Sequence, residues 1–276
     1  MHLDASERLP AAIHNIGVRS TRALIDLGAI SENIRIIRQS LSAGTNLIAV
    51  VKANAYGHGA LFIARAALAA GASMLGVAAV NEGIVLRRQG VRAPILVLGP
   101  ADPSQYIAAV ENGLTLAVNS TAMAAQINTI ANESGRTAHV HLKIDTGMHR
   151  YGCNPDDARP SRRRSRRCPN CGWKAFSPTL RPLTNSTSRR RWRRLNDSIR
   201  RSTRSRQLAC RCRSDHAANS AATIRSRRYD YDAIRLGIAM YGLAPSEDVR
   251  PVAGHGAGPQ AGQPGRSGLE SAGRRA

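Results

Sequence analysis

Apolar segments of strand length alternate with segments of helical periodicity along the first 145 residues. The periodicity and the flanking turn residues predict strands at 47–51, 74–80, 94–99, 114–118 and 138–145. Helices are predicted between them at 59–70, 81–89, 102–112 and 121–133. Strands and helices that alternate at this spacing form right-handed β-α-β units around a parallel sheet. A run this regular favours a closed (β/α)8 barrel over an open sheet.

The chain before the first of these strands is less regular. We predict a short strand over 22–27 (RALIDL) and a helix from Ser31 to about Leu41. Ser31 would be the N-cap of this helix, because its hydroxyl can accept a backbone N–H of the first turn. Ile34 and Ile37 would lie on its apolar stripe.

The strand predicted at 138–145 differs from the others because its polar and apolar residues alternate strictly. The polar residues share one face: His139, His141, Lys143 and Asp145. The apolar residues share the other: Val140, Leu142 and Ile144. In a barrel the apolar face would pack on the outer helices and the polar face would point inward. The alternative is an edge strand with one wet face.

Lys52 stands at the carboxyl end of the first apolar strand. Alternation places it on the same face as Ile48 and Val50. Desolvation at such a position lowers the pKa of an amine and leaves it nucleophilic, as in lysines that form Schiff bases. The alternative is a strand-end lysine whose ammonium group extends to water.

The ten residues 50–59, VVKANAYGHG, resemble the cofactor-attachment motif of the bacterial alanine racemases, which are fold-type III enzymes dependent on pyridoxal phosphate (PLP). The resemblance implies a PLP-binding barrel that interconverts L-alanine and D-alanine, the latter for peptidoglycan. It implies that Lys52 holds PLP and serves as the base on one face of the ring. It also implies that Tyr56 donates a hydrogen bond to the phosphate.

A second motif, DTGMHRYG at 145–152, resembles the same family. The resemblance implies that Arg150 binds the phenolic oxygen of the cofactor and the carboxylate of the substrate. It makes Lys143 the candidate for carbamylation, which would turn a cation into an anion that orients Arg150.

Two later stretches, HAANSAAT at 216–223 and YDAIRLGIAMYGLAP at 231–245, resemble the late barrel loops of the family. By the resemblance, Ser220 and the backbone of Gly237 and Ile238 bind the phosphate, and His216 lies beneath the ring. Arg235 would face the pyridine nitrogen and keep it unprotonated, which favours proton exchange at Cα over transamination. The alternative for the Arg235 strand is a plain amphipathic element.

The charge of the chain is unevenly placed. The formal net charge is +22, but 18 of the arginines lie between Cys153 and Ser214. This stretch has no apolar period and contains all five cysteines. Three interpretations compete: a nucleic-acid-binding insertion, a zinc module, and out-of-frame translation of a GC-rich gene. We favour the third, and we expect about two β-α units of the barrel to be lost there. The zinc module would use Cys168, Cys171, Cys210 and Cys212.

These patterns divide the chain into five parts. They are an extension at 1–20, the first part of the barrel at 21–153, the Arg-rich segment at 154–214, the last part of the barrel at 215–248, and a disordered tail at 249–276. We expect the C-terminal β domain of the family to be absent, together with the tyrosine that serves as its second base. No segment has the length of a transmembrane helix or the apolar core of a signal peptide, so we expect a cytoplasmic protein without membrane contact.

The expected function is therefore that of an alanine racemase whose activity is impaired, acting on alanine with PLP and without a metal. The resemblance implies a homodimer, which the shortened chain puts in question. One alternative is a single-domain barrel that binds PLP without catalysis, as in PLP homeostasis. A second alternative is an Arg-rich nucleic-acid-binding protein, which we rank last.

Overall fold

The computed structural model describes residues 23–145, 150–154 and 214–246, Val249, and the backbone of residues 171–179. In this part of the chain, eight parallel strands form one sheet in the order β7-β6-β5-β4-β3-β2-β1-β8. Their bounds are β1 (Asn46–Val50), β2 (Met74–Val77), β3 (Ile95–Val97), β4 (Thr115–Val118), β5 (Ala138–Asp145), β6 (Cys171–Thr179), β7 (Ser214–Asp215) and β8 (Ala233–Leu236).

The sheet closes on itself between β7 and β8. The Asp232 amide donates to the carbonyl of Asp215 at 3.0 Å, and the Arg235 amide donates to the carbonyl of Ala218 at 2.8 Å. His216 forms a parallel bridge with Ala233 between these two bonds. The fold is therefore an α/β barrel, as the alternation of strands and helices predicts. It is incomplete within the described residues, which include no helix between β5 and β6 or between β6 and β7.

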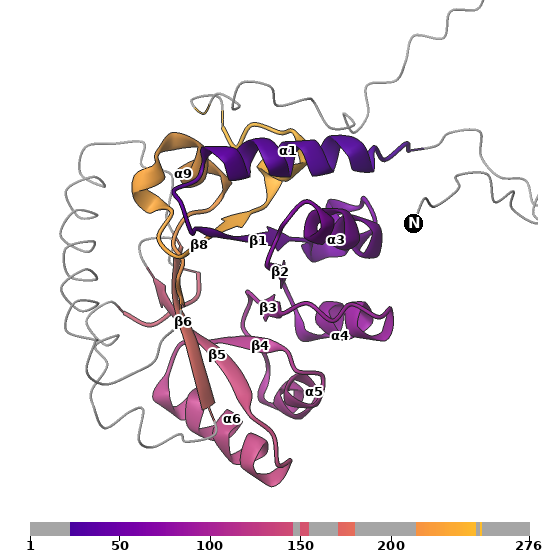
Figure 1. The fold of residues 1–276 in the computed structure, drawn as a ribbon. Coiled ribbons are helices and arrows are strands. Elements are labelled where there is room, and N and C mark those ends of the chain that lie inside the picture. Colours follow the sequence, from indigo (N-terminus) through magenta and orange to yellow (C-terminus); the bar gives the residue numbers. More distant parts are fainter. Residues whose placement is uncertain (1–22, 146–149, 155–170, 180–213, 247–248, 250–276) are drawn as a thin grey trace, which may run out of the picture.

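The helices lie around the outside of the strands (Figure 1). They are α1 (Leu27–Ser40), α3 (Ala60–Ala69), α4 (Val80–Arg88), α5 (Tyr106–Glu111), α6 (Thr121–Glu133) and α9 (Ser220–Arg225). The short segment α2 (Lys52–Tyr56) follows β1 and has left-handed rather than right-handed backbone angles at residues 53–56. In the described part of the chain, three 3-10 turns accompany them: η2 (Pro103–Gln105), η4 (Arg227–Tyr229) and η5 (Ile238–Tyr241). The ranges predicted for α3, α4 and α6 agree with these bounds within one residue.

Alternation along the strands separates two apolar clusters. The larger cluster lies between the strands and the outer helices and includes Leu47 and Ala49 of β1. A smaller cluster includes Ile48 of β1 and Leu96 of β3, so it lies on the inward face of these strands. In β5 the apolar residues belong to the outer cluster, which leaves the polar face pointing inward, as predicted. Since β5 lies between β4 and β6, it is not an edge strand.

The start of α1 differs from the prediction. The helix begins at Leu27 rather than after Ser31, and residues 23–26 form no strand. Asp26 is the N-cap, because its Oδ1 accepts the amide of Ala29 at 2.9 Å. Ser31 lies inside the helix, where its hydroxyl donates to the carbonyl of Leu27 at 2.9 Å. The apolar stripe begins at Ile30, one turn earlier than the prediction assumed.

The Arg-rich segment also differs from the prediction. The backbone of residues 171–179 forms β6, which pairs in parallel with β5, and β7 pairs with β6 in turn. The strand positions that we expected to be lost are therefore filled, because strand pairing uses backbone groups that every non-proline residue supplies. Residues 155–170 and 180–213 lie outside the described part, as do the predicted extension at 1–20 and most of the predicted tail. The reading-frame interpretation stays a prediction.

Candidate functional site

Lys52 lies at the carboxyl end of β1, two residues beyond the last residue of the strand. The intervening Val51 donates its amide to the carbonyl of Gly76 in β2 at 2.8 Å. The Lys52 side chain is half-buried, and its Nζ lies 5.7 Å from the centroid of the Tyr56 ring. The amine thus stands at the edge of the barrel interior, where active sites of this fold are built.

The residues after Lys52 form a left-handed turn. Ala53, Asn54, Ala55 and Tyr56 have φ between 51° and 54°. This conformation costs roughly 1–2 kcal/mol for each residue other than glycine. Hydrogen bonds hold the turn: the Ala55 amide donates to Val51 at 2.9 Å, and Asn54 Oδ1 accepts the Ala60 amide at 2.8 Å. Strain of this kind is typical of functional sites.

The turn brings the Tyr56 hydroxyl close to Gly237 and Ser220. A Cβ placed on Gly237 would lie 3.3 Å from the hydroxyl oxygen of Tyr56 and 3.8 Å from Oγ of Ser220. The buried Ser220 hydroxyl accepts the amides of Gly237 and Ala239 at 2.9 and 3.4 Å. Two hydroxyl groups and backbone amides therefore converge where Gly237 lacks a side chain. Ile238 follows as the first residue of η5, with its side chain 39% exposed.

Tyr241 packs behind this cluster. Its ring centroid lies 5.2 Å from that of Tyr56 in an edge-on arrangement and 4.9 Å from that of His58. Its hydroxyl donates to the carbonyl of Val50 at 3.4 Å, and burial raises its pKa well above the usual value. Burial also raises the pKa of Tyr56. Both phenols therefore stay protonated at neutral pH and available as hydrogen-bond donors.

A chain of hydrogen bonds crosses the barrel interior from β8 to β5. Arg235 is 5% exposed, and its Nη1 donates to Nδ1 and to the carbonyl of His216 at 2.7 and 3.0 Å. Its Nη2 donates to the carbonyl of Ala217 at 3.0 Å. His216 is buried, and its Nε2 lies 2.8 Å from Nδ1 of His141. Since Nδ1 of His216 accepts from Arg235, its proton is on Nε2 and points to His141.

Burial shifts the pKa values of this chain. The pKa of His216 lies well below its usual value, because burial and then the charge of Arg235 disfavour the imidazolium form. Burial lowers the pKa of Arg235 to about 10. At neutral pH the guanidinium group is therefore charged and the imidazole is neutral.

Lys143 lies on the same inward face of β5 as His141. Its pKa is lowered to about 8, first by burial and then by the charge of Arg235, while Asp145 partly opposes this shift. The charge of Arg150 lowers the pKa further, although the side chain of Arg150 is itself exposed. The structure therefore brings Lys143 within the electrostatic reach of both arginines. Residues 146–149, between Asp145 and Arg150, lie outside the described part.

The segment after Arg150 folds back onto the end of β5. The Cys153 amide donates to the carbonyl of Lys143, and the Asp145 amide donates to the carbonyl of Cys153, both at 2.9 Å. The Tyr151 hydroxyl donates to the carbonyl of Ala117 in β4 at 2.6 Å. Burial raises the pKa of Tyr151 to about 12, so this donor is present at neutral pH. These contacts hold the residue next to Arg150 against the barrel.

The residues that the motifs single out come from strands β1, β5, β7 and β8, and from the turns and helices that follow them. Sequence reasoning placed His141 on the polar face of its strand but missed its contact with His216. It also missed Tyr151 and Tyr241. Alternation was the only signal for His141, and the two tyrosines gave no separate signal, since their partners are backbone carbonyls far away in sequence.

The structure bears on two further expectations. Within the described residues, no group of three or more His, Cys, Asp or Glu side chains could hold a metal ion. The side chains of the four cysteines in the predicted zinc module lie outside the described part. No described helix has both the length and the hydropathy needed to cross a membrane.

Comparison with known proteins decides the family. Residues 25–245 match the family described as "Alanine racemase, N-terminal domain". The chain belongs to the alanine racemase family. An alanine racemase from Symbiobacterium thermophilum is 39% identical over 239 residues, which cover 84% of this chain and 62% of that protein. An alanine racemase from a Nostoc species is 40% identical and covers 82% of this chain and 59% of that protein.

Solved structures of the family agree with this fold. The alanine racemase of Bacillus anthracis with bound L-Ala-P has a TM-score of 0.73 at 32% identity, and the match covers 82% of this chain and 59% of that one. The Clostridium difficile alanine racemase in complex with cycloserine has a TM-score of 0.75 at 28% identity, with 85% and 64% coverage. A histidine racemase from Leuconostoc mesenteroides, at 24% identity and a TM-score of 0.73, shares the fold.

The family match spans the Arg-rich segment as well as its flanks, since it runs from residue 25 to residue 245. The chain spans about 60% of the length of the curated relatives that it matches.

Proposed function

We propose that this chain binds PLP through Lys52 and provides the barrel half of an alanine racemase site in the cytoplasm. One observation carries the proposal: the Tyr56 hydroxyl, the Ser220 hydroxyl and the backbone of Gly237 converge beside the end of the strand that leads to Lys52. The names of its relatives, which are alanine racemases, support the choice of alanine as substrate.

The residues present fit the cofactor. A phosphate group accepts hydrogen bonds from hydroxyl groups, and the Tyr56–Ser220–Gly237 cluster offers those of Tyr56 and Ser220, while the Gly237 amide donates to Ser220 Oγ in this structure. A Cβ on Gly237 would fill the space between the two hydroxyl groups. When bound, PLP supplies the electron withdrawal that makes the Cα proton of an amino acid acidic.

Lys52 and Arg235 have separate roles in this proposal. Lys52 would hold the cofactor through its aldehyde carbon and would move the Cα proton of the substrate on one face. Arg235 would face the pyridine nitrogen of the bound cofactor, and its three bonds to His216 and Ala217 hold the guanidinium group in place. Because its pKa of about 10 keeps it charged, it disfavours a proton on that nitrogen.

Arg150 and Lys143 act on the substrate side. We propose that Arg150 binds the substrate carboxylate and that Lys143, once carbamylated, accepts hydrogen bonds from Arg150. The lowered pKa of Lys143 supports this, since carbamylation requires a neutral amine. Proton exchange on the second face needs another base, which the family resemblance assigns to a tyrosine from a partner subunit.

Covalent labelling tests the proposal directly, because the chain has only three lysines: Lys52, Lys143 and Lys174. The protein is loaded with PLP, reduced with borohydride, digested, and analysed by mass spectrometry. We expect the pyridoxyl group on Lys52, no label in Lys52→Ala, and unchanged labelling of Lys52 in Lys174→Arg. Labelling that leaves Lys52 unmodified would contradict the proposal.

Assays of the PLP-loaded protein separate the remaining alternatives. Formation of D-alanine from L-alanine above the Lys52→Ala background supports the racemase assignment. Labelling of Lys52 without D-alanine supports a barrel that binds PLP without catalysis. Retention on DNA that decreases with salt, without labelling of Lys52, would favour the nucleic-acid-binding alternative.

A further inference from the structure

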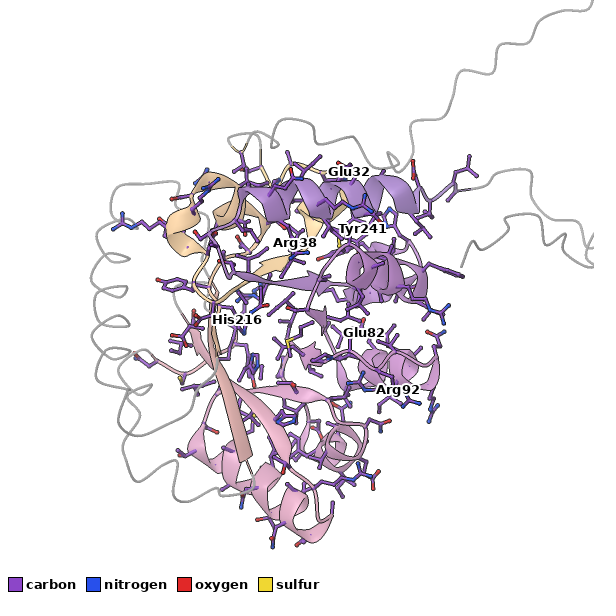
Figure 2. The ribbon with its side chains drawn as sticks, in the orientation of Figure 1. Glu32, Arg38, Glu82, Arg92, His216 and Tyr241 are labelled. Carbon is purple, nitrogen blue, oxygen red and sulfur yellow. The ribbon has the colours of Figure 1, made fainter. Side chains whose placement is uncertain are left out.

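Glu82, in the first turn of α4, joins two loops at the carboxyl end of the barrel (Figure 2). Its Oε2 accepts the amides of Ala78 and Ala79 at 2.6 and 3.3 Å, which caps its own helix. Its Oε1 accepts the amide of Ala53 at 2.7 Å. The first two bonds are local, whereas the third connects residues 29 positions apart in the sequence.

The long-range bond is made to the residue that follows Lys52. Ala53 is the first of the four left-handed residues, and the hydrogen bonds within the turn begin two residues later, at the amide of Ala55. Backbone in this conformation persists only where its surroundings hold it. The Glu82 carboxylate holds the turn at its start, and Asn54 holds it at its connection to α3.

The geometry of the turn decides where two functional side chains lie. Lys52 precedes the turn directly and Tyr56 is its last left-handed residue, so a change in the turn moves both groups relative to Gly237. We propose that Glu82 is a positioning residue of the cofactor site, which acts on Lys52 and Tyr56 through the amide of Ala53. This inference rests on the proposed function and extends it to a residue of the neighbouring β-α unit.

A purely structural role makes a different prediction. If Glu82 only caps α4, its loss would lower the melting temperature and leave the affinity for PLP unchanged. Asp102 provides the matched control, because it caps η2 after β3 with the same chemistry: its Oδ1 accepts the amide and the hydroxyl of Ser104 at 2.9 and 2.6 Å. The hydrogen bonds of the Asp102 carboxylate and amide join it to Ser104 and Gln105, within its own turn.

Two substitutions of Glu82 separate the local bonds from the long-range bond. Glu82→Gln keeps the shape but replaces one accepting oxygen with a donor, so the two sets of amides cannot both be satisfied. Glu82→Asp is shorter by one methylene group. We expect it to keep a bond to the amide of Ala79, three residues before it in the same turn, and to lose the bond to Ala53, 29 residues away.

The experiment measures the dissociation constant for PLP by absorbance titration, and the melting temperature by circular dichroism, for the wild type, Glu82→Gln, Glu82→Asp and Asp102→Asn. We expect about 10-fold weaker PLP binding and slower borohydride labelling of Lys52 in both Glu82 variants. We expect Asp102→Asn to bind PLP within about twofold of the wild type, even where its melting temperature falls.

The outcomes distinguish this inference from the proposed function. If folded Glu82→Asp binds PLP as tightly as the wild type does, the positioning role is overturned. If Lys52 of the wild type is still labelled, the proposed function stays intact in that case. Absence of labelling in the wild type would overturn both. If Glu82→Gln does not fold, Glu82→Asp decides the matter, since it retains the local cap.

Discussion

Burial and neighbouring charges inside the barrel lower the pKa values of Lys143 and Arg235. Lys143 and Arg235 both carry basic groups on the inward face, and each is desolvated by the surrounding strands. Desolvation and like charge both disfavour the ammonium form. With a pKa of about 8, roughly one Lys143 amine in ten is neutral at pH 7, against roughly one in three thousand for an ordinary lysine.

Lys143 should therefore react with electrophiles at a lower pH than an ordinary lysine does. We expect its acetylation by pulses of acetic anhydride, in the folded protein without PLP, to reach half of its plateau near pH 8. In the urea-unfolded chain the midpoint should move to about 10.4. Mass spectrometry of the Lys143 peptide measures both curves. Identical midpoints in the folded and unfolded chains would show that the fold does not perturb this amine.

Sequence motifs identified most of the candidate site residues, but not how the site is held together. Lys52, Tyr56, Ser220 and Gly237 stand in recognisable motifs, and the structure brings the last three together. His141 and Glu82 are different, because their roles arise from contacts between strands and loops that only the folded chain makes. Nothing in the local pattern around Glu82 distinguishes it from an ordinary helix-capping residue.

Elements with strong periodicity were predictable, and the exceptions have physical causes. The strand predicted at 138–145 is β5, with the predicted faces, since strict alternation fixes which side chains point inward. The start of α1 was missed because two capping residues, Asp26 and Ser31, lie five residues apart. β6 was missed because its pairing comes from the backbone and its sequence has no apolar period.

The two capping candidates of α1 give opposite predictions. Asp26→Ala should lower the free energy of unfolding by about 1 kcal/mol, because it removes the acceptor for the Ala29 amide. Ser31→Ala should change it by less than about 0.5 kcal/mol, since this hydroxyl only donates to a carbonyl within the helix. Urea denaturation followed by circular dichroism measures both. A larger loss in Ser31→Ala would restore the later helix start that the sequence predicted.

At the scale of the whole molecule, closure of the barrel depends on a seam between β7 and β8. His216 lies in this seam, where it bridges Ala233, and it also binds Arg235. Because its pKa in the fold lies well below the usual value, the native protein keeps it neutral while the unfolded chain can protonate it. The unfolded state therefore binds more protons once the pH falls below about 6.5.

Stability should fall with pH through this group. The contribution of His216 is fully present above about pH 6.5 and is lost as the pH decreases from there towards the folded pKa, at up to about 1.4 kcal/mol per pH unit. In His216→Gln the free energy of unfolding between pH 7 and pH 5 should decrease less steeply, by up to about 2 kcal/mol over the range. Urea titrations at four pH values measure the two slopes. Parallel slopes would mean that His216 does not titrate differently in the two states.

The pairing of β1 with β8 has a consequence for the synthesis of this chain. Leu47 pairs with Ile234, so the two strands that complete the circle are about 190 residues apart. At about 5–20 residues per second, a ribosome needs about 10–40 seconds to make the intervening chain. Throughout that interval β1 lacks its neighbour β8, and its unpaired backbone edge can pair with strands of other nascent chains. Demand for chaperones during translation should thus concentrate on the first strand that the ribosome produces.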